Sequence, residues 1–154
     1  MSARLLRFGM NLWPPFVGAG IRVRHIAPDY REVRVEMALG LTNRSYFGTH
    51  FGGSLFAMTD PFFALMVVHN LPREYLVWDK SAAIDFQAPG RGRVRAHFVL
   101  TQQDIDTIVR MTAGGAKHLH LFRVDVVDRE SLVVARVEKI VYIRRKKATA
   151  GAER

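Results

Sequence analysis

One carboxylate stands apart in the most apolar part of the chain. Asp60 is the only acidic residue between Glu36 and Glu74, and it lies within the apolar segment 54–70. Burial of a carboxylate without partners disfavours its charged form, which raises the pKa and suits the group to act as a general base or a nucleophile. Asp60 is therefore the first candidate for a catalytic residue.

Two glycines precede this carboxylate. Gly52 and Gly53 stand eight and seven residues before Asp60, where the apolar segment begins. Backbone N–H groups at the start of a helix have no partners within the helix, and the helix dipole favours negative charge there. An amide of Gly52 or Gly53 could therefore stabilise a developing oxyanion while Asp60 acts on a carbonyl carbon.

A structural role for Asp60 competes with this interpretation. Pro61 follows it directly, and Asp followed by Pro is also typical of a helix N-cap with proline at the first helical position. In that case the helix would begin at Asp60 and the carboxylate would only cap it. Where no cap is present, Pro61 should kink the helix.

Other candidate chemistry is weaker. A Ser54–His50–Asp60 triad is disfavoured because Ser54 lacks the pattern of a nucleophile elbow. The histidines do not have the spacing of a metal site, and His118 and His120 alone cannot define one, so no metal is expected. The structural or surface interpretation is preferred for His25, His69, His97, His118 and His120.

The elements that would position these residues follow from hydropathy patterns. Alternation of apolar and polar residues predicts antiparallel strands with one buried face, over 21–24, 33–39, 76–86, 94–101, 118–128 and 132–144. Helices are expected over 2–12, over 54–70, and after Thr101, which with Asp104 resembles an N-terminal cap. The helix over 54–70 is apolar on nearly every side and must be buried by the fold.

This order of elements favours an α+β fold. A sheet of about six antiparallel strands would wrap around one central buried helix, with an N-terminal helix and an additional surface helix. Strands outnumber helices and do not alternate with them, which argues against a doubly wound parallel sheet. The absence of repeats and linkers predicts a single domain over residues 1–143.

Composition restricts the class of protein. The chain has 154 residues, of which 49% are hydrophobic, so it can bury a core. The absence of cysteine excludes disulfides, a cysteine nucleophile and thiolate metal sites. The longest apolar stretch is shorter than a membrane span, and no secretory signal is visible, so a cytoplasmic protein is expected. The net charge of +9 is concentrated in a basic tail, residues 144–154.

Several segments resemble a known family. The run His50-Phe-Gly-Gly-Ser-Leu-Phe-Ala-Met-Thr-Asp60 is similar to hotdog-fold acyl-CoA thioesterases of the phenylacetate-pathway type, in which a His-Gly-Gly loop opens the central helix and an acid follows at this distance. The segment Ile84-Asp-Phe-Gln-Ala-Pro89 is similar to the strand after that helix. The segments Val77-Trp-Asp-Lys80 and Ala135-Arg-Val-Glu-Lys139 resemble an uncharacterised thioesterase subfamily.

The resemblance implies roles for individual residues. Asp60 would act at the thioester carbonyl, and Gly52 and Gly53 would hold the oxyanion. Asn43 would position the acyl group or the water, with His50 beside it, and Asp79 would orient water from the second subunit. Apart from the resemblance, Lys80, Arg91 and Arg93 could pair with the phosphates of coenzyme A, and the alternative is that they are solvated charges at strand ends. The family pattern differs here by an inserted Phe51 and by Pro61.

The predicted function is hydrolysis of an acyl-CoA thioester at the interface of a homodimer or tetramer, with no cofactor apart from the coenzyme A of the substrate. Two alternatives remain. The first is a non-catalytic module that binds acyl-CoA or lipid. The second is an acyl-sensing protein whose basic tail binds nucleic acid or an anionic membrane; specific DNA recognition is not expected, because no recognition helix is visible.

Overall fold

The computed structural model describes residues 1–146. Five helices and six strands follow one another in these residues: α1 (Ala3–Leu12), α2 (Pro14–Ala19), β1 (Ile21–Ile26), β2 (Glu32–Ala38), α3 (Gly52–Ala57), α4 (Phe62–Asn70), β3 (Tyr75–Phe86), β4 (Arg93–Val99), α5 (Gln102–Thr112), β5 (Lys117–Val127) and β6 (Val133–Arg145).

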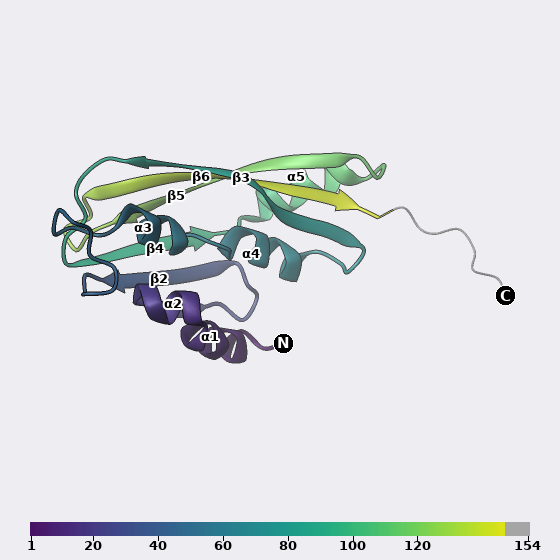
Figure 1. The fold of residues 1–154 in the computed structure, drawn as a ribbon. Coiled ribbons are helices and arrows are strands. Elements are labelled where there is room, and N and C mark those ends of the chain that lie inside the picture. Colours follow the sequence, from purple (N-terminus) through teal and green to yellow (C-terminus); the bar gives the residue numbers. More distant parts are fainter. Residues whose placement is uncertain (147–154) are drawn as a thin grey trace.

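The strands form one antiparallel sheet in the order β1-β2-β4-β5-β6-β3. The sheet curves around α3 and α4, while α1 and α2 lie outside it beside β1 and β2 (Figure 1). The α+β architecture with six antiparallel strands is therefore confirmed. The strand β3 lies at one edge of the sheet and has β6 as its only neighbour within the described residues.

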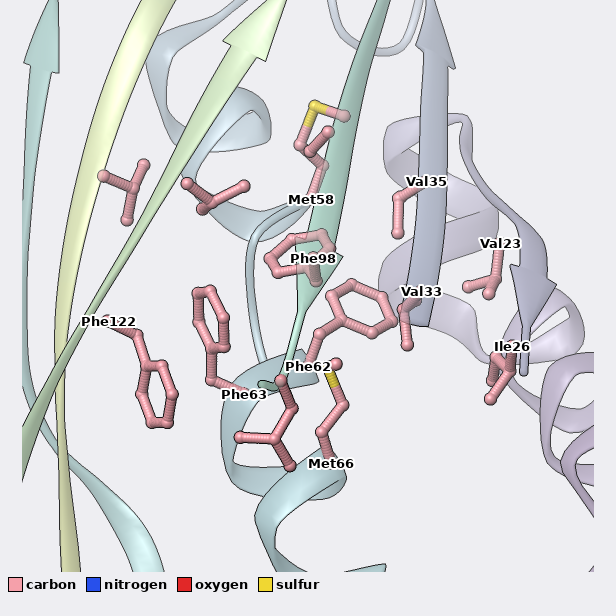
Figure 2. Close-up of a cluster of buried hydrophobic side chains, with 14 of the residues drawn as sticks. Val23, Ile26, Val33, Val35, Met58, Phe62, Phe63, Met66, Phe98 and Phe122 are labelled. Atoms are coloured by element: carbon pink, nitrogen blue, oxygen red, sulfur yellow. The ribbon is translucent and has the colours of Figure 1, made fainter. Parts of the chain in front are cut away.

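The core fills the space between the curved sheet and α4. Phe62 and Phe63 at the start of α4 are buried, and the ring of Phe63 stacks on Phe122 of β5 with centroids 4.4 Å apart. The ring of Phe62 packs against the ring of Phe98 of β4, with centroids 4.9 Å apart. Figure 2 shows these rings between the two walls of the sheet. This packing explains why the segment is apolar on all sides.

The predicted single helix over 54–70 is wrong, because the structure divides it into α3 and α4. The intervening residues Met58–Pro61 form a break, since Pro61 has no N–H to donate to a helical carbonyl. The prediction of a disturbance at Pro61 is confirmed, but the helix is interrupted rather than only kinked. The segment has buried residues on both sides of the break, such as Met58 and Phe62, whereas Asp60, Val68 and His69 are exposed.

Two further boundaries differ from the predictions. Pro14 and Pro15 do end α1, but they also begin α2, where proline at the first positions is favoured. At the other end, β6 continues to Arg145, so Arg144 and Arg145 belong to the sheet rather than to the basic tail. Tail residues 147–154 lie outside the described residues. Among residues 1–146, the helices are too short or too polar to span a bilayer.

Candidate functional site

The break between α3 and α4 places Asp60 at the surface of the single chain. Its side chain is 55% exposed, so the expectation of a solitary carboxylate in an apolar interior is wrong. The N-cap alternative is also wrong, because the cap position of α4 is Pro61 and no side chain caps that helix. Asp60 is therefore free of a structural capping role, and its carboxylate is accessible.

A buried lysine holds this carboxylate. Lys139 lies on β6 with its side chain only 3% exposed, and its Nζ donates a hydrogen bond to Oδ1 of Asp60. The same Nζ donates to Oδ2 of Asp79 over 3.1 Å. A buried ammonium is costly without partners of opposite charge, and here two carboxylates supply them. The sequence analysis missed this residue as a site candidate.

A signal for Lys139 does exist in the sequence. Val137, Val141 and Ile143 of β6 alternate with exposed or half-buried residues and point into the core. Lys139 lies on the same face of β6, at a position where the alternation of buried and exposed residues predicts an apolar side chain. A lysine at a core-facing strand position indicates a buried cation, and such a cation requires acidic partners.

Asp79 completes a cluster of three charges. It lies on β3 opposite Val141 of β6, and a β-bulge at Lys80 follows it. Burial raises the pKa of Asp79, and the nearby Asp60 adds to this effect, whereas the charge and hydrogen bond of Lys139 oppose it. The second oxygen of Asp79 is buried and has no hydrogen-bond partner within the described residues. We name Asp60, Lys139 and Asp79 the charged cluster.

Gly52 and Gly53 are the first residues of α3, so this helix begins two residues earlier than predicted. The amides of Ser54 and Leu55 donate to the carbonyl oxygen of Phe51, whereas within residues 1–146 the amides of Gly52 and Gly53 donate to no backbone carbonyl. A methyl group added at Gly52 would lie 2.9 Å from the ring of Phe86, and one at Gly53 would collide with the ring of Phe51. The glycines thus combine free amides with close aromatic contacts.

Asn43 and His50 hold the loop before α3. The amide nitrogen of Asn43 donates to the carbonyl oxygens of Ala19 and Ala38, and its oxygen accepts from the amide of Gly40. Its side chain is buried and its hydrogen-bonding groups are occupied, so Asn43 holds this loop, and its contact with the acyl group or water stays a prediction.

His50 is buried with its ring against the segment that precedes β4. Its Nε2 lies 2.9 Å from the carbonyl oxygen of Gly92, which fixes the proton on that nitrogen, and Nδ1 has no partner within the described residues. Burial lowers the pKa of His50, although the hydrogen bond to Gly92 opposes this. The ring therefore anchors the loop and burial favours its neutral form, while its expected contact with substrate stays a prediction.

The two predicted phosphate-binding residues lie apart. Lys80 is exposed at the bulge directly after Asp79, and so it neighbours the charged cluster. Arg91 lines a hollow of about 470 Å³ with Arg93, Arg129 and Asp128, to which the charged cluster does not contribute. In the single chain Lys80 is adjacent to Asp79 along β3, whereas Arg91 lines a separate hollow.

A second polar cluster connects β5 with α5. Nε2 of His118 lies 3.1 Å from Nδ1 of His120. Nε2 of His120 lies 3.1 Å from Oδ1 of Asp104. Asp104 also accepts from Thr101 and completes the predicted capping box. Among residues 1–146, the His, Asp and Glu side chains do not form a group of three that could hold a metal ion. These interactions fasten α5 to the sheet.

Comparison with known proteins places the whole folded region in one family. Residues 2–143 match the model of a domain of unknown function, DUF4442. The chain belongs to the DUF4442 family. No match is found among curated protein sequences.

Solved structures show the fold that this DUF4442 chain adopts. A Pseudomonas aeruginosa protein described as of unknown function and a probable thioesterase is 20% identical, with a TM-score of 0.80 over 94% of this chain and 97% of the other. A Haemophilus influenzae thioesterase is 12% identical, with a TM-score of 0.68 over 98% and 96%. A variant of the phenylacetic acid degradation protein PaaI from Thermus thermophilus is 26% identical, with a TM-score of 0.59 over 86% and 99%. The DUF4442 chain has the hotdog fold that was expected.

Proposed function

We propose that this protein hydrolyses acyl thioesters, with Asp60 as the group that acts on the thioester. The observation that carries the proposal is the state of Asp60: the buried cation of Lys139 binds one of its oxygens, while more than half of the side chain stays exposed. An ionised carboxylate that is both oriented and accessible suits general-base or nucleophilic catalysis. The thioesterase descriptions of several structural neighbours agree with this chemistry.

The reaction needs a base or nucleophile and a group that stabilises an oxyanion. Asp60 accepts a proton from water, whose oxygen then attacks the thioester carbon, or the carboxylate attacks that carbon itself. An amide of Gly52 or Gly53 donates to the carbonyl oxygen as negative charge develops on it. The carbon–sulfur bond then breaks. Where water is the nucleophile, the thiolate takes a proton from the acid form of Asp60 or from solvent. Where the carboxylate is the nucleophile, the thiolate takes a proton from solvent, and water then hydrolyses the mixed anhydride and regenerates Asp60.

Distance along the chain argues that two protomers share this site. Gly52 begins α3 and Asp60 lies beyond the last residue of that helix, Ala57, and the six residues of α3 alone span about 9 Å at 1.5 Å per residue. Catalytic groups act on one carbonyl from about 3 Å each, so the amide and the carboxylate of one protomer are too far apart to do so together. We therefore propose that the carboxylate of one protomer works with the amide of another.

The edge strand β3 is the surface we propose for this dimer. Its exposed residues include Leu76, Trp78 and Phe86, which are large and apolar. In the middle of the strand the small residues Ser81, Ala82 and Ala83 are all exposed, so a second backbone can approach closely. An uncovered edge of this kind presents unpaired backbone groups that favour pairing with another strand. A tetramer built from two such dimers is compatible with this arrangement.

The proposed substrate is an acyl-CoA. Lys80 stands beside the charged cluster and is exposed, so its ammonium can pair with a phosphate of the coenzyme. Arg91 could contribute only from another place on the dimer, since it lies apart from the cluster in one chain. No cofactor beyond the coenzyme A of the substrate enters this proposal.

A second candidate function is binding of acyl-CoA without turnover. The rings of Phe86 and Phe51 lie against Gly52 and Gly53, and this aromatic surface beside the two glycines favours the candidate because it offers apolar contacts to an acyl chain. In this case Asp60 and Lys139 would serve only to stabilise the break between α3 and α4.

One experiment separates the two candidates. A panel of acyl-CoA thioesters of increasing chain length is offered to the wild-type protein, thiol release is followed, and binding of the same compounds is measured by calorimetry. Hydrolysis of at least one member supports the thioesterase. Binding without thiol release on any chain length supports the binding module and contradicts the thioesterase proposal.

A further inference from the structure

The charged cluster contains a residue whose contribution goes beyond the proposed catalytic groups. Lys139 is fixed at its backbone, because β6 pairs with β5 on one side and with β3 on the other. Its side chain reaches from this rigid position to Asp60, which lies in the break Met58–Pro61. A residue of the sheet thus controls the orientation of a carboxylate on an irregular segment.

We propose that Lys139 is the positioning residue of this site: its ammonium fixes one oxygen of Asp60 and one of Asp79, and leaves the other oxygen of Asp60 available to the substrate. The inference rests on the proposed thioesterase function. Lys139 is itself too deeply buried to touch a substrate, so it acts through Asp60 and not on the reacting atoms.

Orientation is the first effect of this contact. The segment around Asp60 lacks continuous helical hydrogen bonds, and the exposed carboxylate would sample several rotamers without a partner. A charge-assisted hydrogen bond to a fixed ammonium selects one of them. Because a reacting group must be held close to its productive geometry, loss of this contact should reduce turnover more than substrate binding.

Charge is the second effect. The cluster holds two carboxylates and one ammonium, and Lys139 opposes the rise in the pKa of Asp79 that burial and Asp60 cause. The strand positions paired with Lys139 and Asp79 carry the apolar Phe122, Ala82 and Val141. The neighbouring Glu138 pairs with Arg123, and Lys80 is exposed. Lys139 is therefore the cation that favours the charged form of Asp79.

The test replaces the ammonium by an apolar side chain of similar length. In Lys139→Met, kcat should fall by about 10- to 100-fold while KM changes by less than about 3-fold, since orientation and not binding is lost. The acidic limb of the kcat–pH profile should move to higher pH, because carboxylates without a nearby cation ionise less readily. Lys117→Met, at an exposed position of β5, is the matched control and should behave as wild type.

Chemical rescue tests the role of the charge directly. The chain has no cysteine, so Lys139→Cys carries the only thiol, and 2-bromoethylamine converts it into an analogue of lysine. The reaction is carried out on the unfolded chain, which is then refolded, and wild-type protein passes through the same steps. Recovery of most of the activity and of the original pH profile supports a positioning ammonium.

A double variant and an NMR titration test the role of Lys139 independently of the single variant's activity. If Lys139→Met does not fold, the double variant Lys139→Met/Asp79→Asn removes the cation together with one carboxylate, and it should fold but show the same low kcat. Carbon-13 NMR of the aspartate carboxyl groups should show the pKa of Asp79 rising further in Lys139→Met, a readout that needs no substrate.

The outcomes separate this inference from the proposed function. A wild-type protein that cleaves no thioester overturns the thioesterase and with it the positioning role, even where the NMR titration of Asp79 depends on Lys139. A wild-type protein that cleaves thioesters, together with a Lys139→Met variant that keeps the wild-type kcat and pH profile, overturns the positioning role alone.

Discussion

The ammonium nitrogen of Lys139 lies 3.1 Å from a carboxylate oxygen of Asp79, although the two residues are on different strands and 60 positions apart in the chain. Their strands β6 and β3 are adjacent in the sheet, and both side chains point to the face that covers α3 and α4. The same ammonium also donates a hydrogen bond to Asp60. The ion pair therefore connects the edge strand β3 with the residue that we propose acts on the thioester.

The pH dependence of stability should report the environment of Asp79. Because burial raises the pKa of Asp79 above its usual value of 3.8, the native state binds more protons than the unfolded state between the two pKa values. Its contribution to the free energy of unfolding is therefore fully present below pH 3.8 and declines as the pH rises through the native pKa. Asp79→Asn should abolish this decline.

The measurement is urea denaturation of wild type and Asp79→Asn at a series of pH values from 4 to 7. The stability of the variant relative to wild type should increase across this range. A difference that stays constant, or that decreases toward pH 7, would show that Asp79 does not have a raised pKa in the folded protein.

Asn43 should matter for folding and not for substrate contact. Asn43→Ala removes three hydrogen bonds and leaves the carbonyl oxygens of Ala19 and Ala38 and the amide of Gly40 without a partner. The expected loss is about 2–3 kcal/mol in the free energy of unfolding, measured by chemical denaturation. Under conditions where the variant is folded, KM should stay near the wild-type value. A large rise in KM with unchanged stability would restore the ligand-binding role.

The edge strand β3 should mediate association. Ala83→Lys places a long charged side chain in the middle of the exposed stretch of β3, where the proposed partner strand approaches. Light scattering after size-exclusion chromatography should find the wild type as a dimer or tetramer and the variant as a smaller species. Val109→Lys, at an exposed position of α5, serves as the control. A monomeric wild-type protein would refute the shared site.

Helix α5 should depend on Asp104 in a pH-dependent manner. Burial alone would raise the pKa of Asp104, but hydrogen bonds from Thr101 and His120 outweigh it and lower the pKa below 3.8. The stabilisation from Asp104 is therefore present above pH 3.8 and lost as the pH falls through the native pKa. Asp104→Ala should cost about 1 kcal/mol at pH 7, measured by urea denaturation. The exposed Asp106→Ala should cost less, and equal losses in the two variants would contradict this role.

Much of the fold could be predicted because local patterns and tertiary packing agree. Alternating residues in β1, β2 and β4 match a sheet with one buried face, and Thr101 with Asp104 forms the cap that their spacing predicts. The break between α3 and α4 was not predicted, since apolar residues continue across it on both sides. Pro61 was the signal for it, and its effect was underestimated.

The site was harder to predict, because its groups meet only after folding. Asp60 was found from its isolation in the sequence, but its exposure follows from the helix break, which the pattern does not reveal. Lys139 could have been found as a charge on the inward face of β6. The role of Asn43 depends on carbonyl groups of two distant segments, so spacing alone could not distinguish a loop anchor from a ligand contact.

The hydrolysis rate of Asp60→Asn tests the central claim most directly. Asparagine keeps the size of the side chain but can neither accept a proton at neutral pH nor attack as a carboxylate. With an acyl-CoA that the wild type cleaves, and with circular dichroism confirming the fold, kcat should fall by about 100- to 10,000-fold. A variant that retains the wild-type kcat would contradict the assignment of Asp60 as the group that acts on the thioester.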